Sequence, residues 1–111
     1  MAEPRLATGF WVAAYLRRLE IATIPAYVLR HGDDTAGAVM VKCATLDGRA
    51  SLWVREWDLA ADRWQWITLS EGPEPAIDAE IARNIARDPD LWVIEIESRE
   101  GRTLLDQEGL A

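Results

Sequence analysis

Sulfur and imidazole are almost absent from this sequence: among 111 residues, Cys43 is the single cysteine and His31 the single histidine. One cysteine cannot close an intramolecular disulfide, and the two residues cannot supply a cysteine- or histidine-rich zinc site. No apolar run approaches the roughly 20 residues of a membrane span, and the start of the chain lacks the basic and apolar regions of a secretory signal. We therefore expect a cytoplasmic protein without a metal, another cofactor or a membrane as partner.

Basic residues are also few, since 12 Lys and Arg against 19 Asp and Glu give a formal net charge of -7. A protein that binds a nucleic-acid duplex needs clustered cations to displace counterions from the phosphates, so nucleic acid is disfavoured as a partner. Half of the residues are hydrophobic and 28% are charged, which is a globular composition. The length predicts a single domain over residues 1–111. Its ends, 1–5 and 101–111, are expected to be flexible, although Leu104 and Leu105 can dock.

Apolar periodicity predicts two helices. Thr8 can cap a first helix over residues 9–20, and Pro25 forbids its continuation into the next segment. In a second helix, over residues 76–87, Ile77, Ile81 and Ile85 recur every four residues and form one narrow stripe. This stripe is the natural contact between the second helix and a sheet.

Alternation of apolar and polar residues predicts five strands, over residues 26–30, 38–46, 49–57, 63–69 and 91–98. The strongest turn signal is Asp47-Gly48, because both central positions of a two-residue type I′ turn need positive φ. Strands joined by short turns pair antiparallel. The predicted fold class is therefore α+β, with a mainly antiparallel sheet of about five strands and two helices in the order α-β-β-β-β-α-β.

A two-residue turn at 47–48 pairs Lys42 with Trp53. The register of the following hairpin pairs Trp57 with Trp64, Val54 with Ile67, and Leu52 with Leu69. Because side chains alternate between the faces of a sheet, these registers separate two sets. The apolar set, which the isoleucine stripe can cover, comprises Val39, Val41, Cys43, Leu52, Val54, Ile67 and Leu69. The other set, here named the predicted tryptophan face, comprises Met40, Lys42, Trp53, Arg55, Trp57, Trp64 and Trp66, with Thr68 beside them.

The predicted tryptophan face has two interpretations. In the first, the cations stack on the rings and shield them, while the first helix covers part of the surface. In the second, the face binds another protein or a second copy of the chain, since tryptophan and arginine are enriched in binding hot spots. An uncovered tryptophan patch of this size would be unusual on a monomer. Both interpretations remain open at this point.

Few residues offer chemistry. His31 with Asp33 and Asp34 could place a general base or a metal, but such a string is more often a solvated loop. Cys43 lies among valines, where a thiol is usually inert. The acids of Asp88-Pro89-Asp90 are explained by a turn at a helix end. The glycines at 32 and 37 lack the lysine and the strand-to-helix context of a phosphate loop.

Two segments carry a resemblance to a known family: residues 5–18, RLATGFWVAAYLRR, and residues 30–42, RHGDDTAGAVMVK, which precede the Leu46-Asp47-Gly48 turn. Together they resemble an uncharacterised alphaproteobacterial family, the domain of unknown function fourteen-ninety-one. The resemblance extends from about Arg5 to Ile96 and implies a bacterial cytosolic protein. It implies no activity and no catalytic residues.

Two functions from different classes follow. The first is a non-enzymatic protein-interaction module that uses the predicted tryptophan face. The alternative is a small-molecule-binding protein or an enzyme with a site near the His31 loop. A flat exposed tryptophan surface favours the first, and a deep cleft with convergent polar groups favours the second.

Overall fold

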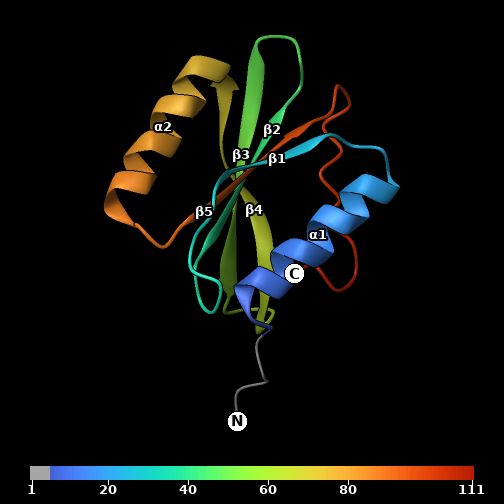
Figure 1. Cartoon of the computed structure of the whole chain (residues 1–111), viewed down its shortest axis with the longest axis vertical. Coiled ribbons are helices and arrows are strands. Elements are labelled where there is room, and N and C mark those ends of the chain that lie inside the picture. Colours follow the sequence, from blue (N-terminus) through green and yellow to red (C-terminus); the bar gives the residue numbers. More distant parts are fainter. Residues whose placement is uncertain (1–5) are drawn as a thin grey trace.

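The computed structural model describes residues 6–111 and shows one five-stranded sheet with a helix on either side (Figure 1). The predicted flexible end at residues 1–5 lies outside the described residues. The elements follow the predicted order, which confirms the α+β fold class. They are α1 (Thr8–Ile21), β1 (Ala26–Arg30), β2 (Val39–Ala44), β3 (Arg49–Asp58), β4 (Arg63–Pro73), α2 (Glu74–Arg87) and β5 (Trp92–Glu97).

The strands are arranged in the order β1-β5-β2-β3-β4. Three of the four pairings are antiparallel, and β5 runs parallel to β2 in the middle of the sheet. The parallel pair arises because α2 carries the chain from the β4 edge back across the sheet before β5 begins. The prediction of a mainly antiparallel sheet is thus correct, and the crossover through α2 adds the one parallel contact.

The first helix begins without a side-chain cap, so the capping role predicted for Thr8 is wrong. Ala7 occupies the cap position, and the Thr8 hydroxyl instead donates a hydrogen bond to the Gly37 carbonyl at 2.9 Å. The first amides of α1 are satisfied by the backbone of the loop before β2, where Gly9 N–H donates to Asp34 O at 2.8 Å. The loop therefore takes the place of a capping side chain.

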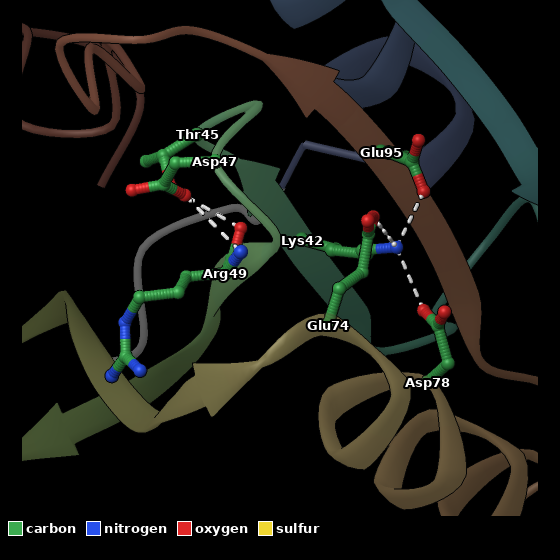
Figure 2. A network of polar contacts seen from close by, with 7 residues as sticks. All are labelled: Lys42, Thr45, Asp47, Arg49, Glu74, Asp78 and Glu95. Atoms are coloured by element: carbon green, nitrogen blue, oxygen red, sulfur yellow. Dashed lines mark hydrogen bonds and ion pairs between the residues drawn. The ribbon is translucent and has the colours of Figure 1, made fainter.

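The turn between β2 and β3 has three residues, so the predicted two-residue turn is wrong. Thr45 N–H donates to Arg49 O, and Leu46 and Gly48 adopt positive φ values of 62° and 84°. The Asp47 carboxylate accepts hydrogen bonds from the Thr45 hydroxyl at 2.6 Å and from Arg49 N–H at 3.1 Å (Figure 2). These bonds, that from Thr45 above all, lower the pKa of the Asp47 carboxyl from its ordinary value.

The extra turn residue shifts the β2–β3 register by one residue, so each side chain of β2 lies on the face of the sheet opposite to the predicted one. Lys42 pairs with Leu52 rather than with Trp53, whose partner is Val41. Met40 and Lys42 therefore lie on the α2 side of the sheet, away from the tryptophans. Val39, Val41 and Cys43 lie on the α1 side, with the tryptophans.

The β3–β4 register is partly as predicted. Trp57 pairs with Trp64, and Val54 pairs with Ile67. The prediction that Leu52 pairs with Leu69 is wrong, because an irregularity between Leu52 and Trp53 shifts Leu52 to Ser70.

Each side of the sheet has its own core. On the α2 side the isoleucine stripe covers Leu52 as expected, but Met40 takes the place of Val39, Val41 and Cys43, which lie on the other side. This buried cluster comprises Met40, Ala50, Leu52, Ile77, Ile81, Leu91 and Val93. On the α1 side the buried cluster includes Trp11, Val12, Tyr15, Leu19, Val41, Cys43, Trp92, Ile94, Ile96, Leu104, Leu105 and Leu110. Three leucines of residues 101–111 thus belong to this core, and they hold the segment after β5 against α1 and the sheet.

Candidate functional site

Five residues of the predicted tryptophan face share the α1 side: Trp53, Arg55, Trp57, Trp64 and Trp66. Because neighbouring residues of one strand point to opposite faces, their alternate positions on β3 and β4 bring these side chains together. Met40 and Lys42, the other two, point to the α2 side. The corrected face is therefore confined to the β3–β4 hairpin.

The centre of this face is covered. The rings of Trp11 from α1 and Trp66 from β4 stack with centroids 5.3 Å apart. Both indole N–H groups donate to the Leu110 carbonyl oxygen, Trp11 at 3.1 Å and Trp66 at 2.8 Å. The Trp53 indole donates to the Ser51 hydroxyl at 2.9 Å. These contacts satisfy the three donors inside the molecule, so this part of the face is structural.

The outer end of the face is open. Trp57 and Trp64 meet edge to face, with ring centroids 5.6 Å apart and an interplanar angle of 76°. Trp57 is 41% exposed, and Leu59 in the hairpin turn is 86% exposed. The Arg55 guanidinium lies 5.1 Å from the centroid of Trp64 and donates to the backbone oxygen of Ala111 at 2.9 Å. We name Trp57 and Trp64 the outer tryptophan pair.

The β3–β4 hairpin extends beyond the end of β2, and a pocket lies beside the extended part. The pairing of β3 with β2 ends at Val54, opposite Met40, whereas the pairing with β4 continues to Asp58. The pocket encloses about 390 Å³. Its lining includes Trp11, Trp64, Arg55, Thr8, residues 35–40 and, from the end of α2, Asn84 and Asp88. The loop that follows His31 therefore forms one of its walls.

A second groove, of about 680 Å³, shares Trp64 with this pocket. It runs between the start of β4 and the segment after β5. Its lining includes Trp53, Trp66, Arg63, Gln65, Arg102 and Gln107. Trp64 lines both hollows, so each of them reaches the outer tryptophan pair.

Lys42, which sequence reasoning placed among the tryptophans, is buried under α2 with three carboxylates around it (Figure 2). Its ammonium lies 2.7 Å from Asp78, 2.9 Å from Glu74 and 2.9 Å from Glu95. Burial acts to lower the pKa of the lysine, but hydrogen bonds to Asp78, Glu74 and Glu95 outweigh it and raise the pKa above its ordinary value. The cluster ties α2 to the sheet.

The His31 loop is built for packing. The His31 ring lies 4.0 Å from the Trp92 ring and 3.0 Å from the Asp34 carboxylate. A Cβ atom on Gly32 or Gly37 would lie 2.3 or 2.4 Å from the Asp90 carbonyl oxygen, so both positions require glycine for close backbone approach. This loop thus joins the start of β5 to the start of α1, which explains the glycine-bounded segment without catalysis.

The remaining candidates lie apart. Cys43 is fully buried, and its burial raises the pKa of its thiol, which makes it a poor nucleophile. Asp88 accepts a hydrogen bond from the Asp90 N–H in the turn before β5. In residues 6–111, no group of three or more His, Cys, Asp or Glu side chains is placed to hold a metal ion. Within the same range, no helix is long and apolar enough to cross a membrane.

Sequence reasoning missed two features of this region: the cluster around Lys42 and the role of Leu110. The available signal for the cluster was the group of acidic residues in the first turns of α2 and at Glu95 of β5, which require a cation as partner. Lys42 is that cation. The backbone oxygen of Leu110 accepts hydrogen bonds from two indole N–H groups. The only sequence feature that pointed to Leu110 was its apolar side chain in an otherwise polar segment.

Comparison with known proteins identifies the family. The family model described as "Protein of unknown function (DUF1491)" matches residues 6–106. The chain belongs to the DUF1491 family. None of the curated proteins compared with the chain matches it.

Solved structures agree with this assignment. A crystal structure of a DUF1491 family protein from Caulobacter crescentus is 39% identical, with a TM-score of 0.80 over 92% of this chain and 94% of that one. An NMR structure of a DUF1491 family protein from the same species is 39% identical, with a TM-score of 0.79 over 94% and 96%. A solution structure from Agrobacterium tumefaciens is 31% identical, with a TM-score of 0.71 over 86% and 87%. The relatives are bacterial, and none of these descriptions gives an activity.

Proposed function

We propose that this DUF1491 protein is a non-enzymatic, cytoplasmic protein-interaction module whose partner docks on the outer tryptophan pair. The observation that carries the proposal is Trp57, a large aromatic side chain that is 41% exposed on a hairpin projecting past β2. Indole rings at binding surfaces combine a large apolar area with few rotatable bonds, so ordering them on binding costs little.

The surroundings of Trp57 support this proposal. Trp64 holds the Trp57 ring edge to face, so the exposed surface is preorganised. Leu59 adds apolar area at the hairpin turn, and Arg63 at the start of β4 is exposed. Apolar anchors beside an arginine are typical of the centre of a protein interface. The covered tryptophans, Trp53 and Trp66, form the rigid base.

The experiment is a comparative capture from a bacterial lysate with the wild type, Trp57→Ala and Trp64→Ala as baits. Phe10→Ala is the matched control, because Phe10 is an aromatic residue that is 71% exposed on α1. A protein retained by the wild type and by Phe10→Ala, but lost with both tryptophan variants, supports the proposal. If every captured protein is retained by all four baits, the outer tryptophan pair is not the docking site.

A second candidate function is small-molecule binding in the pocket of about 390 Å³. The observation that favours it is that three polar residues, Thr8, Arg55 and Asn84, line this space together with Trp11 and Trp64. Volumes of this order suit small ligands, and a few polar groups among aromatic walls give orientation. This function corresponds to the alternative site near the His31 loop.

The two functions are separated by filling the pocket. Asn84→Trp places an indole in the pocket wall, and Arg83→Trp makes the same change at an exposed neighbouring position of α2. A metabolite mixture that raises the melting temperature of the wild type and Arg83→Trp, but not of Asn84→Trp, supports the pocket. If no mixture shifts the melting temperature of the wild type, the pocket function is rejected.

A further inference from the structure

Residues 106–111 lie over the tryptophan side of the sheet without joining it, and we name this segment the strap. Residues 98–111 contain no helix or strand, and Figure 1 shows the strap in red beside α1. Among residues 6–111, the backbone hydrogen bonds of the strap stay local: Gln107 N–H donates to Leu104 O at 3.0 Å, and Leu110 N–H donates to Gln107 O at 3.2 Å. The strap is therefore held against the rest of the molecule by side chains.

Four side-chain donors from α1, β3 and β4 hold the strap by its backbone. The bonds are Trp11 to Leu110 O at 3.1 Å, Trp66 to Leu110 O at 2.8 Å, Arg18 to Glu108 O at 2.8 Å and Arg55 to Ala111 O at 2.9 Å. Each bond ends on a backbone carbonyl, a group that every residue carries. Peptide-binding sites commonly divide recognition in this way, with main-chain bonds for affinity and side-chain pockets for specificity. The four donors therefore do not require the strap's own sequence.

One side chain of the strap enters the core. Leu110 is 1% exposed and belongs to the buried cluster on the α1 side, whereas the other five residues of the strap are exposed. Gly109 precedes it with a φ of 88°, a conformation in which other residues are strained. A Cβ atom at Gly109 would also lie 3.0 Å from Arg18 Nη2. The feature that the site selects is thus a glycine followed by a leucine.

The strap leaves space beside it. The groove of about 680 Å³ is lined by Trp64 and Trp66 of β4, by residues 101–107 and by Ala111. A bound segment longer than the strap therefore has room to continue toward Trp64, a member of the outer tryptophan pair. The strap uses one apolar anchor and no backbone ladder with the sheet, so its exchange for another segment breaks no strand pairing.

We propose that the strap is an intramolecular ligand, which fills a binding site for an extended segment of a partner protein and gives way to that segment. The partner segment presents a leucine after a glycine, as Gly109 and Leu110 do, and its carbonyl groups accept from the four donors. The apparent affinity for the partner segment then scales with the fraction of molecules whose site is open. This inference goes beyond the proposed function, because the site lies under the strap and its test needs no natural partner.

The first test opens the site and offers it a peptide. The probe is the hexapeptide DQEGLA, the sequence of residues 106–111 with both ends blocked, and the control peptide is DQEGDA. In Leu110→Asp the strap cannot seat, because a carboxylate would be buried among apolar side chains. Titration should show saturable binding of DQEGLA to Leu110→Asp and binding to the wild type that is weaker by more than about tenfold. DQEGDA should bind neither protein.

Leu110→Ala is the second variant, because it removes the anchor without burying a charge. It should also bind DQEGLA more tightly than the wild type does. Equal binding of DQEGLA by the wild type and by every variant that folds, or binding by none of them, overturns the proposal. Failure of both variants to fold contradicts it as well, because a strap that gives way to a partner cannot be required for the fold.

Indole N–H resonances give the second test, at the level of single residues. The resonances of Trp11 and Trp66 should shift when Leu110→Asp releases the strap, and they should return toward their wild-type positions when DQEGLA is added. Trp53 is the internal control, since its indole donates to the Ser51 hydroxyl at 2.9 Å and its resonance should stay in place. Peptide-induced shifts that spare Trp11 and Trp66 contradict the assigned site.

Trp57→Ala separates this inference from the proposed function. Added to Leu110→Asp, it should leave the affinity for DQEGLA unchanged within about threefold, because Trp57 is not among the four donors. Loss of peptide binding in the double variant contradicts a site under the strap. If the peptide binds as expected while the capture experiment fails, only the proposed function is rejected.

Discussion

The Lys42 ammonium lies 2.7 Å from the Asp78 carboxylate, a contact that joins the centre of the sheet to the first turns of α2. The lysine is 3% exposed, and the carboxylates of Glu74 and Glu95 complete its hydrogen bonds. A buried charge with several well-placed partners fixes how two elements dock, although its net contribution to stability is smaller than its contacts suggest. Removing only one member of such a cluster leaves the rest uncompensated.

We predict that Lys42→Met lowers the free energy of unfolding by about 3 kcal/mol, because the three carboxylates then face one another without a cation. Methionine keeps most of the apolar stem, so the loss reports on charge rather than on packing. Arg49→Met is the control, since Arg49 is an exposed cation on the same hairpin (Figure 2). Urea unfolding of both variants checks this, and equal midpoints would contradict it.

The raised pKa of Lys42 predicts a loss of stability in alkali. The folded protein holds this proton more tightly than the unfolded chain, whose lysine titrates near 10.5. The contribution is therefore fully present below the unfolded pKa and is lost as pH rises through the folded pKa. The stability difference between wild type and Lys42→Met should be constant from about pH 7 to about pH 10, where the three carboxylates are ionised, and shrink above it. A difference that grows with pH would refute the assignment.

The glycines of the His31 loop should be intolerant of any side chain. We predict that Gly37→Ala lowers the free energy of unfolding by about 2 kcal/mol or more, because its Cβ would lie 2.4 Å from the Asp90 carbonyl oxygen. Gly72→Ala is the matched control, since a Cβ there meets nothing within 4 Å. Thermal melts of the two variants give the comparison. A tolerated Gly37→Ala would show that the loop does not pack closely on the β5 entry.

His31 itself should be dispensable for the fold. We predict that His31→Ala changes the free energy of unfolding by less than about 1 kcal/mol and leaves metal content unchanged, because the side chain is exposed. Calorimetry and elemental analysis of the purified protein check this. Stoichiometric metal in the wild type that disappears in the variant would restore His31 as a ligand.

The sequence predicted the elements well because their signals are local. The isoleucine stripe of α2 and the turn residues between strands placed every helix and strand, and β1 was predicted with its observed bounds. The predicted β2–β3 register was wrong because the register depends on whether the turn has two or three residues. Leu46 takes the positive φ that Asp47 was expected to take.

No pattern in β2 could have corrected that register. Both faces of β2 are buried, so Val39, Val41 and Cys43 on one side are as apolar as Met40 and Ala44 on the other. Lys42 alone distinguishes the sides, and its partners come from α2 and β5, far along the sequence. Residues 98–111 cover part of the tryptophan face. This tertiary contact could not be predicted either, because the segment has no periodic apolar pattern.

The tryptophans should divide into core and surface. We predict that Trp66→Ala lowers the free energy of unfolding by roughly 3–5 kcal/mol, because it removes the stack on Trp11 and the bond to Leu110. Trp57→Ala should cost less than about 1 kcal/mol, since Trp57 is 41% exposed. Denaturant unfolding of the two variants measures the contrast. Equal and large losses would place Trp57 in the core.

The most direct test of the proposed function is the affinity of the captured partner, measured by titration against the wild type, Trp57→Ala and Phe10→Ala. A hot-spot tryptophan is worth about 2 kcal/mol or more, so Trp57→Ala should weaken binding by roughly 30-fold. Phe10→Ala should bind within about threefold of the wild type, and both variants should melt like it. If Trp57→Ala binds the partner as tightly as Phe10→Ala does, the outer tryptophan pair is not the interaction site.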